Sequence, residues 1–470
     1  MNNLISPITR RAILQKASAL ALAPAVAPLG LGLMGMANAA TQTANDYKAL
    51  VYVFLSGGND AYNTVVPYDP TNYDQYYLRR KGDVSGNYSG IAVLRSKLAA
   101  TALSTKGLPS GMQMALNPTM GGLKRVFDAG RAGILMNVGL LKVPTTLKQF
   151  KDRSVPLHGN MFSHTQSRDW RRGAGKAGGW GGQVADLFLD DNPAASLSCI
   201  NVGGPGDFLV GGSVRGYRTT PAGPAVVSAL SSGKLFGSAA GAQALDALIR
   251  QPSDHLMSDI YTAATRGALD LRQTVLDKIG TSVPAKYASW FPAASGGNLA
   301  AQLQMVARLI EQGPRLDMKR QIFIVGLGGF DKHDGGDAPH ASLIGSVSTA
   351  LEQFDAAMMG LNMANSVTAF TGSDFGRQLT SNGDGTDHGW GGHQLIVGGA
   401  VNGGRFFGEA PVTGTGHSHD ARGGALLPTT ATEQLSVELG RWFGVSDADL
   451  GAIFPNSRNF DLHKLGVFKA

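Results

Sequence analysis

The sequence predicts a three-layer α/β domain that has a mainly parallel central sheet with loop and helix insertions. Short apolar runs, which have the length of buried strands, alternate with segments whose apolar residues have helical spacing. Between residues 321 and 370 a strand, a helix and a strand follow one another, which is the order of a parallel βαβ unit. Glycine and polar residues follow several apolar runs, as is typical of strand ends in open α/β sheets.

Six apolar runs are predicted to be strands of this sheet. Most are unbroken rather than alternating, which is typical of strands that are buried on both faces. They cover residues 49–55, 133–139, 197–203, 321–327, 367–370 and 394–399. Residues 402–408 are predicted to form a hairpin with the last strand.

Helical spacing predicts the helices that cover the sheet. They lie at residues 117–129, 178–190, 253–279, 298–311, 342–363 and 432–443. The long helix at 253–279 is interpreted as a clamp or lid. Residues 68–115 are predicted to be an irregular excursion over the surface. Because no internal repeat and no linker is evident, residues 40–470 are predicted to form a single domain with insertions.

The N-terminus is interpreted as a twin-arginine signal peptide over residues 1–39. Arg10 and Arg11 precede a long apolar stretch that ends in the small residues around Ala39. The alternative is a membrane anchor, but the Pro and Gly content and the A-x-A ending favour cleavage. We therefore expect a periplasmic or secreted protein that uses the twin-arginine export machinery. Because no later apolar stretch approaches about 20 residues, no stable membrane insertion is expected after cleavage.

Composition excludes some classes of protein. The chain is 43% hydrophobic and 16% charged, so a sizeable core is possible. Its 64 glycines are about twice the average share, which indicates many tight loops. The formal charge of +7 falls to +4 without the three cations of residues 1–39, and no basic run points to nucleic acid. The single cysteine, Cys199, cannot form an internal disulfide and is interpreted as a buried thiol.

Potential metal ligands follow three of the predicted strands. Because the carboxyl ends of parallel strands meet at one edge, we expect these side chains to converge in one pocket. Asp387 is a further potential ligand. Any one of them has a structural alternative, which for Asp60 is a turn or a helix N-cap. The candidate ligands are Asp60, Asp331, His333, Asp374, His388 and His393.

This mixture of carboxylates and imidazoles predicts a divalent metal, Zn first, with Mn, Mg and Ca as alternatives. Two metals about 3.5–4 Å apart can clamp a phosphoryl or sulfuryl oxygen and activate water. Arg377, which lies close to Asp374, is a candidate to bind the substrate anion. Ser163 is a candidate nucleophile. Its alternative is a polar loop that leads into a helix, with Ser163 or Thr165 as the cap.

Several motifs together resemble an exported bacterial family known as domain of unknown function 1501, over nearly the whole chain. They are the paired-arginine signal, SGGNDAYNTVVP from residue 56, FSH at 162–164, GGFDKHD from 328, TGSDFGRQL from 371 with GTDHGWGGH from 385, and GVSDADLGAIFPN from 444. That family is similar in its core to the alkaline phosphatase and sulfatase superfamily. The resemblance therefore implies an alkaline phosphatase-like sandwich.

The resemblance also implies roles for single residues. Asp60 matches the metal-binding Asp after the first strand, and Ser163 is a candidate for the nucleophile position. Asp331 and His333 match the Asp/His pair of one metal, and Asp374 matches the Asp of the superfamily's T-S-D-H-G motif. The last ligand matches His393, or alternatively His388.

Two departures distinguish this sequence from the superfamily. Only Lys332 separates Asp331 from His333, where the superfamily has a wider gap. Phe375 stands where a histidine usually follows Asp374. His388 could substitute for it, or one metal site, or both, could be lost.

The sequence thus favours an exported metal-dependent hydrolase of phosphate or sulfate esters, with a small anionic ester or glycan as substrate. The first alternative is a non-catalytic envelope protein that binds an anionic glycan or a partner. The second is a structural or assembly protein that a buried metal stabilises. In a degenerate site the ligands would not converge within metal distance.

Overall fold

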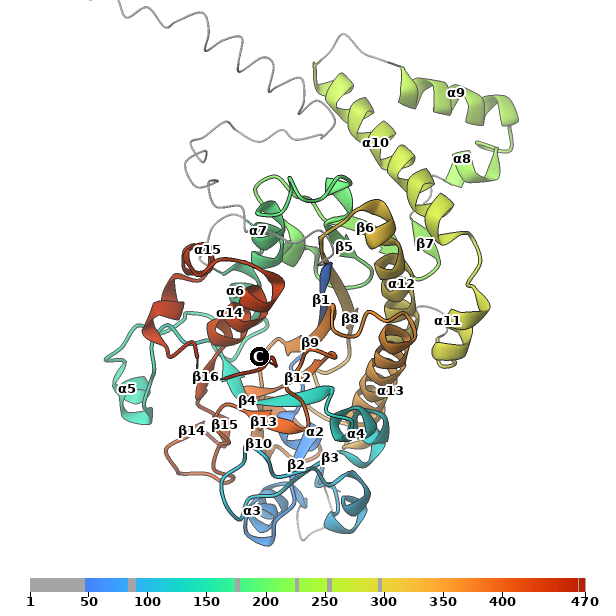
Figure 1. Cartoon of the computed structure of the whole chain (residues 1–470). Coiled ribbons are helices and arrows are strands. Elements are labelled where there is room, and N and C mark those ends of the chain that lie inside the picture. The colour runs from blue at the N-terminus through green and yellow to red at the C-terminus, as the bar shows by residue number, and fades with distance from the viewer. Residues whose placement is uncertain are drawn as a thin grey trace, which may run out of the picture. The chain divides into compact units, whose positions relative to one another are not determined.

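The computed structural model describes residues 47–82, 90–173, 178–224, 228–251, 256–294, 298–463 and 465–469 (Figure 1). The predicted signal peptide lies outside these residues. Among the described helices, none is both long enough and apolar enough for a membrane span. Within the described part, residues 223–282 form one compact unit, the helical unit, and the rest form another, the sheet unit. That residues 40–470 form a single domain stays a prediction.

The sheet unit is built on a large, mainly parallel sheet, which confirms the mixed α/β class. Its strand order is β13-β4-β12-β9-β1-β8-β5-β6, with β16 also paired to β4. From β9 to β6 all neighbours are parallel, whereas β12 runs antiparallel to both β4 and β9. The bounds are β1 Lys48–Leu55, β4 Ala132–Gly139, β5 Cys199–Asn201, β6 Tyr217–Thr220, β8 Arg320–Leu327, β9 Val367–Ser373, β12 Gly392–Val397, β13 Arg405–Phe407 and β16 Thr430–Ala431.

Helices lie on both faces of this sheet (Figure 1). On one side are α12 (Leu299–Gln312) and α13 (Ala338–Gly360), and on the other are α7 (Trp180–Asp186) and α14 (Thr432–Phe443). Side chains of β1 join the core with residues of α7 and α14. Burial on both faces explains why the strands appear in the sequence as unbroken apolar runs.

The other elements are short and mostly connect or flank these layers. They are α2 Ala61–Thr64, β2 Val65–Pro67, α3 Pro70–Arg80, β3 Met114–Leu116, α4 Gly121–Asp128, α5 Leu147–Asp152, α6 Gln166–Arg172, α11 Ala285–Trp290, β10 Arg377–Ser381, β11 Thr386–His388, β14 Asp420–Arg422, β15 Ala425–Leu426 and α15 Asp447–Ile453. The helical unit contains β7 Gly223–Pro224, α8 Ser228–Ser232, α9 Ala239–Arg250 and α10 Leu256–Ile279, so the predicted long helix is present.

Two predictions about local structure are wrong. Residues 68–115 are not only irregular, because they contain α3 and β3. Asp69 caps α3 by accepting a hydrogen bond from the Asn72 amide, and the buried face of α3 consists of tyrosines and Arg80 rather than aliphatic residues. Residues 402–408 form no hairpin with β12, since β12 is already paired on both sides, and β13 pairs in parallel with β4 instead.

Candidate functional site

Asp331 and Asp374 lie at the carboxyl edge of the three adjacent parallel strands β8, β1 and β9. Asp331 follows β8, and Asp374 directly follows β9. His164, from the loop before α6, links the two carboxylates. Its Nε2 lies 3.3 Å from Asp331 Oδ2, and its Nδ1 lies 3.2 Å from Asp374 Oδ2. The expectation that strand ends bring potential ligands together therefore holds for this pair.

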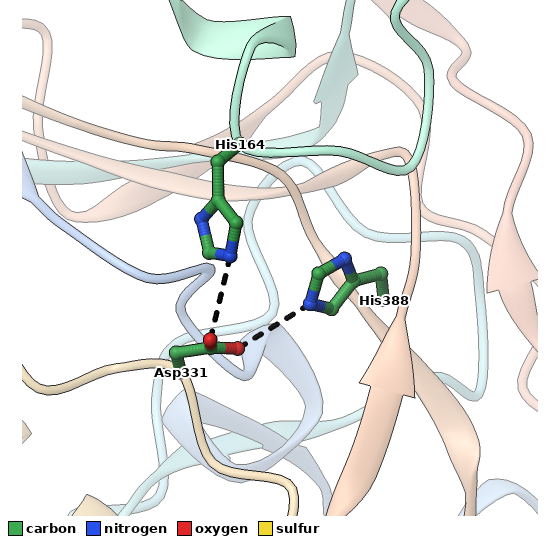
Figure 2. A group of neighbouring side chains, drawn as sticks. All are labelled: His164, Asp331 and His388. Carbon is green, nitrogen blue, oxygen red and sulfur yellow. Dashed lines mark hydrogen bonds and ion pairs between the residues drawn. The ribbon is translucent and has the colours of Figure 1, made fainter.

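The centre of the site is a group of three side chains, His164, Asp331 and His388, which we call the edge cluster (Figure 2). Each offers one potential ligand atom, and these atoms lie within 4.8 Å of one another. The two imidazoles point at different oxygens of Asp331, because His388 Nε2 lies 3.3 Å from Oδ1. His388 ends β11, so the hairpin of β10 and β11 delivers it to the strand edge.

His333 lies beside the edge cluster. Its Nε2 is 3.1 Å from Asp331 Oδ1 and 3.0 Å from His388 Nε2. Asp387 is farther away, with its Oδ1 3.8 Å from His333 Nδ1. The sequence-predicted residues that the structure gathers here are thus Asp331, His333, Asp374 and His388, and His164 joins them.

The contact at Nδ1 fixes the tautomer of His388 but not that of His164. His388 Nδ1 lies 3.0 Å from the carbonyl oxygen of Phe162, which can only accept, and His164 Nδ1 faces the Asp374 carboxylate. His388 Nδ1 must therefore carry the hydrogen, which in a neutral imidazole leaves its Nε2 lone pair directed at Asp331. His164 instead places both of its nitrogens against carboxylates, so one of these two contacts requires a second proton or a bound cation. A metal ion would be such a cation.

The distances also fit a metal. Zinc ligands lie about 2.0–2.2 Å from the ion, so neighbouring ligands of a tetrahedral site are about 3.3–3.5 Å apart. The two imidazole-to-carboxylate distances of the edge cluster, 3.3 Å each, match that separation. Two imidazoles and a carboxylate are a common zinc donor set, and backbone or carboxylate partners behind the ligands are typical of such sites.

The charges of the cluster suit ligation. Burial raises the pKa of Asp331, but the hydrogen bond and the charge of Arg377 outweigh it, so the pKa lies below its usual value and the carboxylate is ionised. Burial is the main cause that lowers the pKa of His388. This shift favours the neutral imidazole, which is the form that binds a metal.

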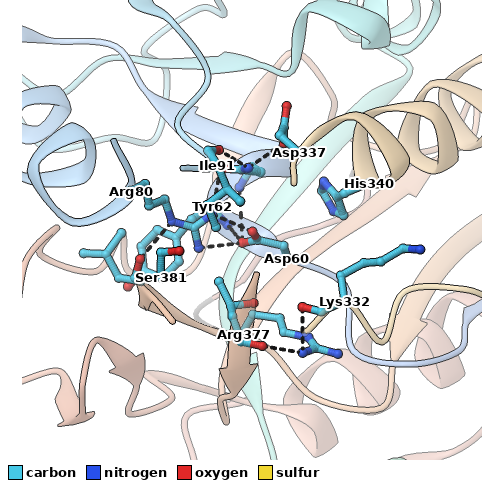
Figure 3. Close-up of polar contacts among 12 residues, drawn as sticks. Asp60, Tyr62, Arg80, Ile91, Lys332, Asp337, His340, Arg377 and Ser381 are labelled. Carbon is cyan, nitrogen blue, oxygen red and sulfur yellow. Dashed lines mark hydrogen bonds and ion pairs between the residues drawn. The ribbon is translucent and has the colours of Figure 1, made fainter. Parts of the chain in front are cut away.

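Arg377 does not serve as the predicted substrate-binding cation. Its side chain is 1% exposed, and all of its hydrogen bonds go to groups of the protein, among them the Lys332 carbonyl oxygen (Figure 3). One goes to Asp331 Oδ1, and the others reach the carbonyl oxygens of Gly57, Gly58, Phe330, Lys332 and Thr386. Arg377 instead holds Asp331 in place and ties together the loops that follow β1 and β8.

Ser163 is not positioned as a nucleophile at the cluster. Its hydroxyl donates a 2.8 Å hydrogen bond to the carbonyl oxygen of Asn160 within its own loop and lies 2.8 Å from Thr165 Oγ1. Its neighbour His164 is the residue that reaches the site. Sequence reasoning missed His164, although the FSH motif drew attention to the loop that carries it. Thr165 occupies the N-cap position of α6 without a side-chain capping bond.

Asp60 is a structural residue rather than a ligand of the edge cluster. It caps α2 by accepting hydrogen bonds from the Tyr62 and Asn63 amides, so the alternative of an N-cap is confirmed. Both of its oxygens are bound by Arg80, at 2.5 Å and 2.9 Å (Figure 3). Burial raises its pKa, but Arg80 outweighs burial and holds the pKa below its usual value.

His393 is also outside the edge cluster. It lies in β12, is buried, and its Nδ1 accepts a 3.1 Å hydrogen bond from the Asn137 amide. Phe375 lies against the cluster instead, with its ring centroid 4.1 Å from that of His388 and 5.1 Å from that of His164. The phenyl ring therefore packs on the two imidazoles and contributes no ligand.

Two buried histidines predict that the protein loses stability in acid. Burial lowers the pKa of both His340 and His393 from 6.5 to about 4. Between these values the unfolded chain binds protons that the folded chain does not. The free energy of unfolding should therefore fall, as pH drops from 6.5 towards 4, by up to about 1.4 kcal/mol per pH unit for each histidine.

Thermal unfolding at several pH values checks this expectation. A His340→Gln variant, in which an amide replaces the imidazole, should show a shallower loss of Tm between pH 6.5 and 4.5. An unchanged slope in this variant would contradict the buried, neutral state of His340.

Comparison with known proteins supplies a family and two distant structures. A family model described as "Protein of unknown function (DUF1501)" matches residues 47–452. No curated protein matches the chain. The crystal structure of Ps i-CgsB matches with a TM-score of 0.32 and 8% identity, covering 89% of this chain and 78% of that one. Ps i-CgsB in complex with k-i-k-neocarrahexaose matches with a TM-score of 0.31 and 10% identity, over the same shares of both chains.

Proposed function

We propose that this chain, which belongs to the DUF1501 family of proteins of unknown function, is a metal-dependent hydrolase of phosphate or sulfate esters. The observation that carries the proposal is the edge cluster, in which two imidazoles face the two oxygens of one carboxylate. The mainly parallel sheet, with the cluster at its carboxyl edge, supports an alkaline phosphatase-like sandwich as part of the same proposal.

His164, Asp331 and His388 would hold a divalent metal, zinc first, with Mn, Mg and Ca as alternatives. His333 is close enough to join them or to replace His164. When bound, such a metal polarises the ester oxygens and makes water a stronger nucleophile. The partners behind the ligands are Asp374 for His164, the Phe162 carbonyl for His388, and Arg377 for Asp331.

Because the Ser163 hydroxyl is bonded within its own loop, we propose water as the nucleophile. His333, whose side chain is 46% exposed, would take the proton of that water at Nδ1, because its Nε2 carries the hydrogen that faces His388 Nε2 and Asp331 Oδ1. Asp374 would keep His164 oriented throughout. Its own oxygens accept hydrogen bonds from the Gly57 amide at 2.7 Å and from the Ser167 hydroxyl at 2.6 Å.

Metal analysis of the purified, folded protein tests the proposal. We expect about one equivalent of zinc or another divalent metal by elemental mass spectrometry, together with hydrolysis of 4-nitrophenyl phosphate or 4-nitrophenyl sulfate. A chelator should abolish the hydrolysis and lower the Tm, because a metal at 100 times its Kd stabilises the folded state by about 2.7 kcal/mol. A folded protein that takes up no metal would rule the proposal out.

The proposal includes a location and a substrate class. We propose export by the twin-arginine machinery, cleavage after Ala39, and a periplasmic or secreted mature protein. The substrate would be a small anionic ester or a glycan that carries one. A double variant, Arg10→Lys with Arg11→Lys, tests the export step. It should keep the protein in the cytoplasm with its leader still attached.

One observation favours the alternative of a non-catalytic binding or assembly protein. Phe375 packs against both cluster imidazoles, and the donors of Arg377 are all used within the protein. A protein that binds one metal and an anionic glycan but hydrolyses neither ester class would support this alternative.

A further inference from the structure

We infer that Arg422 binds the anionic group of the substrate beside the edge cluster. The inference rests on the proposed function. It assigns to Arg422 the binding of the substrate anion, a role that Arg377 cannot have. Arg422 ends β14, and its side chain is exposed. Among the described residues it has no hydrogen-bond or ion-pair partner, and its guanidinium lies 4.1 Å from the centroid of the Phe162 ring.

Two separate chains of contacts connect Arg422 to His388. The first runs through Phe162, whose ring lies under the guanidinium and whose carbonyl oxygen lies 3.0 Å from His388 Nδ1. The second runs through the next residue, Gly423, where an added Cβ would lie 2.6 Å from Gln378 Oε1. The amide nitrogen of Gln378 lies 3.4 Å from the His388 carbonyl oxygen.

Other aromatic rings hold the Phe162 ring, on which Arg422 stacks, in place. The Phe162 centroid lies 5.9 Å from that of Trp390 and 6.3 Å from that of Phe150. Trp390 is 1% exposed, and its indole nitrogen donates a hydrogen bond to the Leu140 carbonyl oxygen. A guanidinium stacked on a fixed ring loses little freedom on binding, and its edge N–H groups remain available for a ligand.

The charges of the cluster call for a further cation, and Arg422 is an exposed one that no carboxylate of the described residues has taken. Asp331 and Asp374 are carboxylates, and the positive charge of Arg377 is paired with Asp331. A phosphate or sulfate ester approaching these groups needs a cation that no carboxylate has taken. The planar fork of Arg422 suits two oxygens of one tetrahedral oxyanion, which is the group that both ester classes share.

Titration with inorganic phosphate and with inorganic sulfate, followed by calorimetry at fixed ionic strength, tests the inference on the metal-loaded protein. Arg422→Ala should lower the affinity for at least one of the two anions about tenfold or more, as expected for lost hydrogen bonds to a charged group. Arg422→Lys should recover only part of the affinity, because an ammonium cannot bind two oxygens in the same way. The anion that loses more affinity indicates the preferred ester.

Arg458→Ala is the matched control, because Arg458 is also exposed and its loss changes the net charge equally. The affinity of this control should stay within about twofold of the wild type, because Arg458 takes no part in the contacts that connect Arg422 to His388. Equal weakening in both variants, or none in Arg422→Ala, would overturn the inference.

Metal content separates this test from that of the proposed function. The metal content of Arg422→Ala should match that of the wild type, since Arg422 contributes no ligand. If the wild type hydrolyses esters and Arg422→Ala binds both anions normally, the inference fails and the hydrolase stands. If the wild type binds anions through Arg422 but hydrolyses neither ester, the Arg422 site stands and the hydrolase fails.

Discussion

Replacing Asp60 by alanine is expected to lower the free energy of unfolding by about 3–5 kcal/mol, as is typical when one partner of a buried ion pair is removed. Arg80 is 0% exposed, and its two terminal nitrogens bind both oxygens of Asp60. The substitution would leave the guanidinium buried against Tyr62 and Tyr76 without its counter-charge. Denaturant unfolding followed by circular dichroism measures the effect.

Two further variants separate the charge from the helix cap. Asp60→Asn keeps a side chain that caps helices well but removes the charge, so it should lose most of the same stability. The double variant Asp60→Leu with Arg80→Met removes both charges and should recover a large part of it. If Asp60→Asn instead keeps full stability and loses its metal, Asp60 is a ligand and the structural interpretation is wrong.

His164→Ala and His388→Ala should each lower metal affinity by at least about 100-fold, which is the upper end of the effect of residues that only support a ligand. Each substitution removes one of the three potential ligand atoms of the edge cluster. Activity against the 4-nitrophenyl esters should fall with the metal. Competition with a fluorescent zinc chelator measures the affinity, and unfolding experiments show whether the variants still fold.

Asp374→Asn provides a graded comparison. The amide oxygen of the new side chain can still accept a hydrogen bond from His164 Nδ1, but it carries no charge. The metal affinity should therefore fall by about 10–100-fold. His419→Ala removes a half-buried histidine that lies outside the cluster, and its metal affinity should stay at the wild-type value. Equal affinity in His164→Ala and His419→Ala would contradict the edge cluster as the metal site.

The sequence predicts the sheet well because its strands are buried on both faces. The expected strands at 49–55, 133–139 and 321–327 differ by one residue or less from β1, β4 and β8 at either end. The rule that ligands follow parallel strands also brings Asp331 and Asp374 to one edge. Helix α3 is missed because its buried face consists of Tyr73, Tyr76 and Arg80, which do not form an apolar stripe.

The detailed roles at the site depend on partners that are distant in the chain. A carboxylate after a strand has the same sequence signature whether it faces a metal or an arginine, and only α3 shows that Asp60 faces Arg80. His164 comes from a loop 210 residues before Asp374, so sequence spacing gives no sign of their contact. Arg377 follows a potential ligand, as a substrate-binding arginine would, yet its donors meet carbonyl groups that only the folded chain brings close.

The bonds of Arg377 also bear on when the site can form during folding. This one side chain, which follows β9, is bonded to carbonyl groups 319 and 320 residues earlier in the chain and to Asp331 after β8. In a chain in which β1, β8 or β9 is not yet paired in register, Asp331 is not held in its final position. Metal affinity should therefore appear late, when the central sheet is complete, and a nascent or partly folded chain should not compete for the ion. If the proposed export acts on the folded protein, ion uptake before export would report that folding is finished.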